Sequence, residues 1–363
     1  MSASTKQRQT LLTLIELVEN PGKTMPVLEH TEICYLLAFP DKAETPTPAE
    51  QVKGLKNAPY FQPVDIHLHA LGQETIKLGE ISVSILRQRY DDRVQIIECR
   101  FVLAEVLSEA AVSLRQQIEN SLQERLIPEQ YRANGLFEVY VILQIQDQVG
   151  VPDEFINSNA ETLAGFIRSQ REILDSSVIE DIFISRIRYS KEDLTLVDWE
   201  AALIFAPSAD FQSDIELLKI GNYQLLRYRM LGQSIEEILR IINADFKRGK
   251  QSMWSLTNGN LRNIVNHRLE LMLDFEHNEQ NLLFIGDWYT AKLYHLISDE
   301  FYLNHWKDAI QTKLDNLENI LNTIQENFTL SWRGLMENVQ LAGWLILLVG
   351  YFILYFKDLA LTK

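Results

Sequence analysis

The chain has 363 residues, of which 46% are hydrophobic and 23% charged, with a formal net charge of −16 and an isoelectric point near 5.0. This length can bury a sizeable core, and the composition is that of a globular protein, which excludes a polytopic membrane bundle. The acidic balance argues against nucleic acid as a partner, because a polyanion is repelled unless a basic patch is present, and we find no such patch in the sequence.

The first residues form an apolar stretch that we interpret as an amphipathic helix. Glu16 and Glu19 interrupt the apolar core that a secretory signal peptide needs, and no small-residue cleavage site follows. The basic, acid-poor start would also suit an organelle transit sequence, which stays an alternative. We assign residues 1–39 to this helix and a first strand. Residues 40–63 hold five of the ten prolines and are predicted to be a linker.

Alternation of apolar and polar residues then predicts an antiparallel sheet. Strands are expected over residues 64–68, 81–85 and 93–103, with a turn at Asp91 and Asp92 joining the last two.

Two further local signals lie in or near this region. Cys34 and Cys99 occupy apolar, strand-like runs, which predicts buried thiols. Ser108 is expected to cap a helix that runs to about residue 124.

The middle of the chain has a β-α-β-β-α order. A strand is predicted over residues 136–146, a helix near 153–170, a strand from Ile182, a strand over 194–205, and then a long helix. This order resembles a ferredoxin-like sandwich, in which helices cover an antiparallel sheet. We therefore expect residues 64–207 to form an α+β sheet domain.

One strand-like segment suggests metal chemistry, since Asp65, His67 and His69 alternate with apolar residues. It resembles the D-x-H-x-H strand of metal-dependent amidohydrolases, where two imidazoles bind a divalent metal that activates water. That family needs an eight-fold βα barrel with further ligands, whereas the later histidines here lie in helical sequence. An amphipathic strand with the three polar side chains pointing outward explains the same pattern. We assign no metal, cofactor or catalytic residue, and a hydrolase built on these three residues stays an alternative.

From Ser213 onward the sequence has the periodicity of helices. Ser213 and Glu216 have the spacing of a capping box, a second helix is expected near residues 261–276, and a third begins near Ile285. The last helix carries a heptad seam, with apolar residues at alternating spacings of four and three. The seam consists of Ile310, Leu314, Leu317, Leu321, Ile324 and Phe328. It predicts a stalk over residues 208–337, either a helical hairpin within one chain or a coiled coil between chains.

The segment at residues 338–356 is uncharged, and its length at the helical rise is about 28 Å, close to the hydrocarbon core of a bilayer. We predict one transmembrane helix over residues 338–357, followed by a short tail at 358–363. The expected anchor residues are Leu341, Trp344, Leu348, Tyr351, Phe352, Tyr355 and Phe356. The alternative is a helix buried in a soluble core.

The expected topology follows from the order of these segments. With no signal sequence ahead of it, a spanning segment near the C-terminus would emerge only after translation ends, which predicts a tail-anchored protein with its N-terminal part in the cytosol. The membrane would be a bacterial inner membrane or an organelle membrane. The expected partners are the lipid bilayer, a second copy of the chain through the stalk and membrane helix, and an unidentified protein.

Residues 213–239 and 314–348 carry a further resemblance. An apolar helix containing the stretch QLLRYR, a leucine-spaced stalk and a terminal membrane helix are together similar to the family named for a requirement in meiotic nuclear division. Its members include bacterial membrane proteins and mitochondrial inner-membrane relatives linked to organelle translation. The resemblance covers the C-terminal two thirds of the chain and implies a membrane-tethered, non-enzymatic, self-associating protein, with no catalytic residue to carry over.

Together these features predict an α+β protein made of an antiparallel, ferredoxin-like sheet domain, a long-helix stalk and one C-terminal transmembrane helix. The predicted function is that of a tether or scaffold at a membrane. The common nucleotide-binding, nucleophile-elbow and zinc-protease motifs are absent from the sequence, which favours a non-enzymatic role without deciding it.

Overall fold

The structure is a computed structural model that describes residues 28, 30–42, 50–51, 66–170, 172, 174–248, 269, 272–273 and 288–361. The chain divides into two compact units. Unit 1 comprises Met1–Arg227 and Asn281–Leu303, and unit 2 comprises Tyr228–Gln280 and Asn304–Lys363. The predicted N-terminal helix, proline-rich linker and helix near residues 261–276 lie largely outside the described residues.

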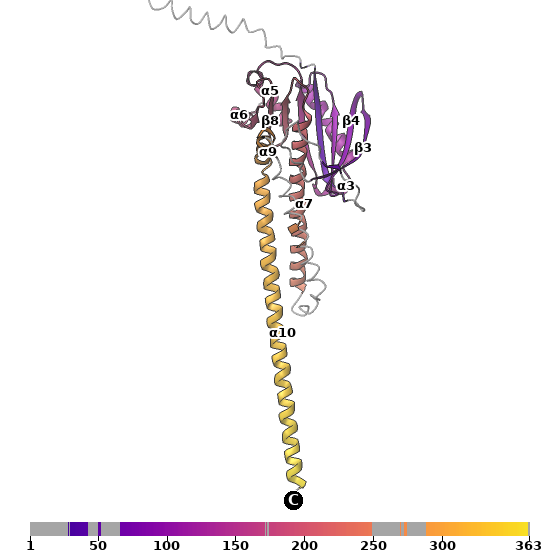
Figure 1. Ribbon diagram of the computed structural model, residues 1–363. Coiled ribbons are helices and arrows are strands. Elements are labelled where there is room, and N and C mark those ends of the chain that lie inside the picture. The colour runs from indigo at the N-terminus through magenta and orange to yellow at the C-terminus, as the bar shows by residue number, and fades with distance from the viewer. Residues whose placement is uncertain are drawn as a thin grey trace, which may run out of the picture. The chain divides into compact units, whose positions relative to one another are not determined.

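In its described part, unit 1 is built on a nine-stranded sheet with the order β2-β3-β4-β5-β1-β6-β9-β8-β7. Figure 1 labels β3, β4 and β8 of this sheet. Neighbouring strands are antiparallel except for β6 and β9, which run parallel. The strands are β1 (Thr31–Pro40), β2 (Glu50–Gln51), β3 (His67–Leu78), β4 (Ile81–Tyr90), β5 (Val94–Phe101), β6 (Glu138–Ile145), β7 (Arg186–Ile187), β8 (Leu194–Val197) and β9 (Ala201–Phe205).

In the described residues, five helices lie between β5 and β7 in the sequence, and three follow β9. The first group is α2 (Glu109–Leu126), α3 (Glu129–Asn134), α4 (Pro152–Ser158), α5 (Ala160–Ile167) and α6 (Ser176–Ile182). The second group is α7 (Gln212–Arg248), α9 (Trp288–Glu300) and α10 (Leu303–Leu361). The α+β class predicted from the sequence is confirmed.

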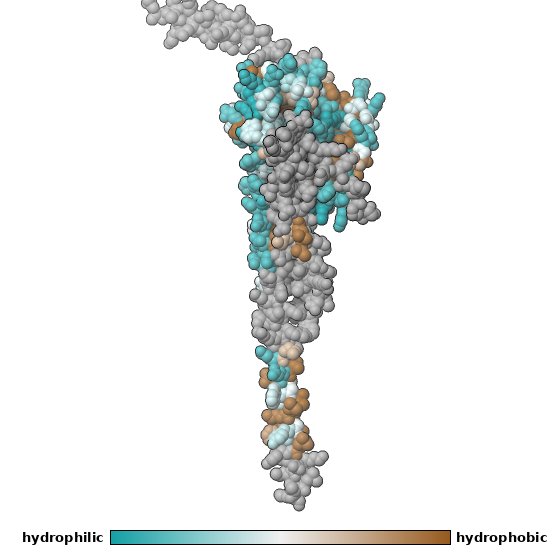
Figure 2. Space-filling view, viewed as in Figure 1, coloured by the Kyte–Doolittle hydropathy of each residue, from teal (hydrophilic) through white to brown (hydrophobic). Residues whose placement is uncertain are grey.

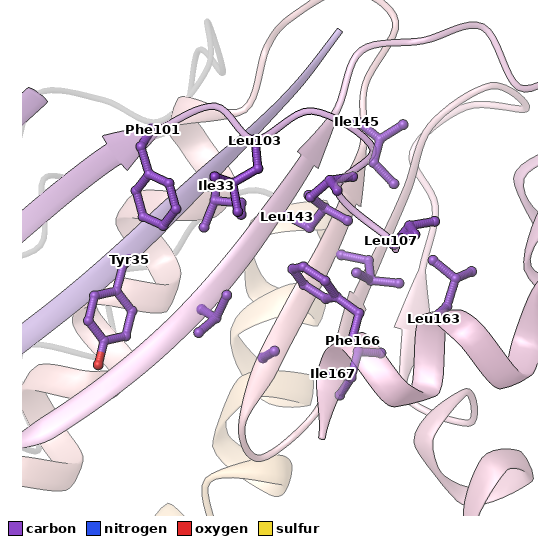
Figure 3. Close-up of a cluster of buried hydrophobic side chains, with 14 of the residues drawn as sticks. Ile33, Tyr35, Phe101, Leu103, Leu107, Leu143, Ile145, Leu163, Phe166 and Ile167 are labelled. Carbon is purple, nitrogen blue, oxygen red and sulfur yellow. The ribbon is translucent and has the colours of Figure 1, made fainter. Parts of the chain in front are cut away.

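The main hydrophobic core lies between one face of the sheet and the helices α2, α4 and α5. Alternate residues of the central strands, such as Tyr35 of β1 and Leu143 of β6, pack there against Ile118 of α2 and Phe166 of α5. Figure 3 shows Leu163, Phe166 and Ile167 of α5 facing the strand residues Leu143 and Ile145. Burial of this apolar surface is the main force that holds these helices on the sheet.

The N-terminal part of α7 is attached to the sheet through a buried ionic network. Lys219 is fully buried, and its Nζ lies 2.6 Å from Glu98 Oε2 of β5 and 2.7 Å from Glu216 Oε1. Lys219 also donates to Gln88 Oε1 at 3.1 Å, and Arg100 Nε donates to Glu98 Oε1 at 2.5 Å. Each buried charge thus has an opposite charge beside it, which offsets the cost of its desolvation.

Helix α9 approaches α7 closely at a glycine. A Cβ atom on Gly221 would lie 2.5 Å from Ile297 Cγ2, with the ring of Phe301 at 3.1 Å. Only a residue without a side chain permits this separation at this position.

Several local predictions are confirmed. β4 and β5 are joined at Asp91 and Asp92, whose φ values of 49° and 53° suit the tight turn of a hairpin. Ser108 caps α2, where its Oγ accepts a hydrogen bond from Ala111 N at 3.2 Å. The two cysteines are buried and free.

Three predicted elements are wrong. The strand expected from Ile182 is instead the end of α6, and only the short strand β7 follows it. The strand expected over residues 194–205 is two strands, β8 and β9, because Asp198 reverses the chain: its N donates to Ala201 O at 3.0 Å.

The third wrong prediction is the capping box. Ser213 lies inside α7, which begins at Gln212. Glu216 does not serve a cap, since its carboxylate accepts hydrogen bonds from Lys219 and Gln212.

Candidate functional site

A pocket of about 300 Å³ in unit 1 is bounded by β1, β6, α2, α7 and the turn between β8 and β9. Three carboxylates and five aromatic rings line it. The carboxylates belong to Glu119, Glu138 and Glu200, and the rings belong to Tyr35, Phe137, Tyr140, Trp199 and Phe301. A concave site that combines aromatic surface with a few polar groups is typical of small-molecule binding.

Glu119 belongs to a buried ion pair on α2. Arg115 is 1% exposed, and its Nε lies 3.1 Å from Glu119 Oε1, one helical turn away. The guanidinium carbon lies 4.0 Å from the ring centre of Phe166, and Arg115 Nη2 donates to Ser169 Oγ at 2.5 Å. Burial raises the pKa of Glu119 to about 7, although the positive charge of Arg115 opposes the shift.

A second ion pair lies at the turn between β8 and β9. Arg168 Nη2 is 3.0 Å from Asp198 Oδ1, and Arg168 Nη1 is 3.9 Å from Glu200 Oε1. Tyr140 OH donates to the backbone oxygen of Asp198 at 2.8 Å, which joins β6 to this turn. Burial raises the pKa of both carboxyl groups, against the lowering effect of Arg168. Perturbed carboxyl groups beside a pocket are typical of functional sites.

The stability of unit 1 is expected to depend on the ionisation of Glu119. A glutamate in the unfolded chain loses its proton near the ordinary pKa of 4.5, whereas the folded group holds it to about pH 7. Between these values the folded state binds more protons, so the contribution of Glu119 to stability falls as pH rises, by at most about 3 kcal/mol in total.

Urea unfolding of the wild type and of Glu119→Gln between pH 5 and pH 8 checks this expectation. The free energy of unfolding of the wild type should decrease relative to that of the variant as pH rises. Subtraction of the two curves cancels the shared contributions of Asp198 and Glu200. Parallel curves would contradict the raised pKa.

The predicted metal-ligand residues are only partly described. Asp65 lies outside the described residues. His67 is exposed, and its Nδ1 lies 3.6 Å from Asp91 Oδ1, whereas His69 Nε2 lies 3.3 Å from Asp92 Oδ1. His69 is 6% exposed, so the expectation that its side chain points outward is wrong. No group of three His, Cys, Asp or Glu side chains suited to a metal ion occurs within the described ranges.

The predicted anchor residues lie on α10. Met336–Leu354 is 19 residues long and apolar enough to cross a membrane, and no part of it is buried within the structure. Leu341, Trp344, Leu348, Tyr351 and Phe352 are all exposed by half or more of their surface. Tyr355 and Phe356 belong to the same helix, but their side chains lie outside the description. Figure 2 shows the resulting apolar surface on the C-terminal part of α10.

The predicted seam lies further toward the N-terminus of α10. Ile310, Leu314 and Leu317 are buried, and Leu317 packs against Ile238 and Ile242 of α7. The remaining seam residues have side chains that the structure does not describe: Leu321, Ile324 and Phe328.

Contacts within unit 2 give the direction of this pairing. Lys313 Nζ lies 2.6 Å from Glu236 Oε1, and a Cβ on Gly232 would lie 3.3 Å from Ile310 Cδ1. Contacts advance in the same direction along α7 and α10, so these helices run parallel and do not form a hairpin with each other. A hairpin with the segment before α10, or a coiled coil between chains, stays a prediction.

Comparison with known proteins gives one family and one relative. Residues 41–212 match the family described as the N-terminal domain of the uncharacterized protein MJ0711. The uncharacterized protein MJ0711 of Methanocaldococcus jannaschii is 25% identical to this chain over 219 residues, which cover 58% of this chain and 65% of the relative. The chain thus spans less than two thirds of that protein's length. No solved structure matches the chain.

The matched segment runs from before β2 to the first residue of α7. It includes α2, α5 and the β8–β9 turn, and therefore most of the residues that line the pocket. It ends before α9 and α10, so the similarity to this family concerns the sheet of unit 1 and not the apolar segment of α10.

Sequence reasoning missed the pocket because its lining comes from distant segments. One local signal was available: Arg115 and Glu119 lie four residues apart on a helix whose neighbouring turns carry apolar residues. That spacing puts both side chains on one face, here the buried one.

Proposed function

We propose that the chain is a single-pass membrane protein in which Met336–Leu354 spans the bilayer and unit 1 is presented at the membrane surface. The observation that carries this proposal is the exposure of that whole segment. Nineteen helical residues extend about 28 Å, which fits the hydrocarbon core. Large apolar side chains cover the helix on every side, whereas a helix at the surface of a soluble core has one polar face.

Exposure of this segment to water would be costly. Leaving a large apolar side chain in water costs about 1.5–3 kcal/mol of free energy relative to burying it. Leu345, Ile346, Leu347 and Leu348 follow one another around the helix and are all more than half exposed. A partner covering one face of the helix would leave the others in water, whereas lipid surrounds all of them. Trp344 and Tyr351 are side chains that favour the membrane interface.

The role that fits this arrangement is that of a tether or scaffold at a bacterial inner membrane or an organelle membrane, with unit 1 in the cytosol. Support comes from the resemblance to the family named for a requirement in meiotic nuclear division, whose pattern implies a membrane-held, self-associating, non-enzymatic protein. We include membership of that family in the proposal.

Membrane fractionation with a carbonate wash at high pH tests the anchor. The full-length chain should stay in the membrane. Leu345→Arg combined with Val349→Arg should move it to the supernatant, because each arginine at a helix centre costs about 3 kcal/mol of insertion. Thr312→Arg with Asn316→Arg is the matched control, since these positions are exposed, have the same spacing and lie on α10 outside the apolar segment.

The control pair should leave the chain in the membrane. A wild-type chain that carbonate extracts, and that is monodisperse without detergent, would overturn the anchor. The same result would favour a segment covered by protein, either by residues outside the description or by a second copy.

A further inference from the structure

The charged side chains that line the pocket in unit 1 all carry carboxyl groups. Glu119, Glu138 and Glu200 line it, whereas Arg115 and Arg168 are not among its lining residues. Both guanidinium groups are engaged with carboxylates, Arg115 with Glu119, and Arg168 with Asp198 and, at 3.9 Å, with Glu200. An anionic ligand would therefore meet carboxylates first, and a cation is the charge that the pocket favours.

The aromatic rings of the pocket suit a cation as well. Tyr140 and Phe301 meet edge to face, with ring centres 5.1 Å apart, and Trp199 meets Phe301 in the same way at 6.4 Å. Aromatic faces carry negative potential and attract cations, tryptophan most strongly. Trp199 is 41% exposed, so part of its ring is available at the pocket.

A metal ion is a poor occupant. Divalent metals need several ligands that converge within about 2.0–2.6 Å of one point. Across the described ranges, no three acidic, histidine or cysteine side chains are grouped closely enough to do this. The carboxylates are spread around a space of about 300 Å³, which matches a cation with its own organic bulk.

We propose that this pocket binds a small organic cation, either a quaternary ammonium compound or a protonated amine. The cationic group would lie against the exposed part of the Trp199 ring, with Glu200 at the solvent-exposed side and Glu119 at the buried side. This inference goes beyond the tether proposal and does not depend on the membrane segment.

Calorimetric titration of the full chain in an uncharged detergent tests the proposal. The probe is choline, and the control ligand is 3,3-dimethyl-1-butanol, which has the same shape without the charge. Choline should bind saturably and at least about tenfold more tightly than the alcohol, because the cation–π and ionic contributions together exceed 1.4 kcal/mol.

Variants locate the binding. Trp199→Leu and Glu200→Gln should each weaken choline binding about three- to tenfold, and both positions are exposed enough that the fold should tolerate the change. Glu80→Gln is the matched control, since Glu80 is exposed in the turn between β3 and β4 and does not line the pocket. Thermal unfolding of each variant verifies that it is folded.

The proposal would be overturned in either of two ways. One is the absence of saturable binding for choline, tetraethylammonium and spermidine alike. The other is binding that Trp199→Leu and Glu200→Gln leave unchanged in folded protein. Neither result bears on membrane anchoring, which the fractionation experiment tests separately.

Discussion

Lys219→Met is expected to destabilise unit 1 by about 3–5 kcal/mol, because it removes the cation beside Glu216 and one of the two cations beside the buried Glu98, which keeps only Arg100. Lys219 is 0% exposed, and the carboxylates of Glu98 and Glu216 both lie within 2.7 Å of its Nζ. Burial alone would lower the pKa of Lys219, but these two carboxylates outweigh it and raise the pKa. Chemical unfolding of the full chain at neutral pH, followed by circular dichroism, measures the loss.

Two variants make this result specific. Lys77→Met removes a lysine from an exposed position of β3 and should change the free energy of unfolding by less than about 0.5 kcal/mol. Lys219→Met combined with Glu98→Gln should recover part of the loss, because one of the two carboxylates that lose this cation is removed with it. A cost below about 1 kcal/mol for Lys219→Met alone would show that the carboxylates find other partners or water.

Phe166→Ala is expected to cost about 3–5 kcal/mol, the range for removal of a phenylalanine from a packed core. Phe166 of α5 is 1% exposed and packs among the sheet residues of the core (Figure 3). The guanidinium carbon of Arg115 lies 4.0 Å from the centre of its ring. The alanine variant loses apolar burial and also leaves Arg115 beside a cavity. Equilibrium unfolding in urea again provides the measurement.

Phe166→Leu separates these two effects. Leucine keeps most of the apolar volume but has no aromatic face, so this variant should cost about 1–2 kcal/mol, largely from the lost contact with Arg115. Val102→Ala, at a position that is 56% exposed, is the control and should stay within about 0.5 kcal/mol of the wild type. If the leucine and alanine variants were equally destabilised, the aromatic contact and not the cavity would account for the loss.

The elements predicted correctly are those whose cause is local. The strands at residues 81–85 and 93–103 follow from alternation over a few residues, and the turn at Asp91 and Asp92 follows from residues that tolerate positive φ. Ser108 has only to reach the backbone three residues away to cap α2.

Two of the errors concern side chains whose partners the local sequence pattern does not reveal. Glu216 has the spacing of a capping residue, yet the buried Lys219 and Tyr90 of β4 engage its carboxylate. His69 was expected at the surface because histidine is polar. In the structure it is buried, and its Nε2 lies 3.3 Å from the carboxylate of Asp92 on the hairpin turn between β4 and β5. The periodicity of apolar residues and the residue types of a segment carry no information about such partners.

The sequence by itself determined the α+β class, most strands of the sheet, and an uncharged C-terminal segment long enough to span a bilayer, since these depend on short-range periodicity and composition. Only the tertiary structure decided that Lys219 is buried in an ionic network, and that Glu119, Trp199 and Glu200 share one pocket. Those groups come from separate strands, helices and turns, and their proximity is set by how the whole sheet packs against its helices.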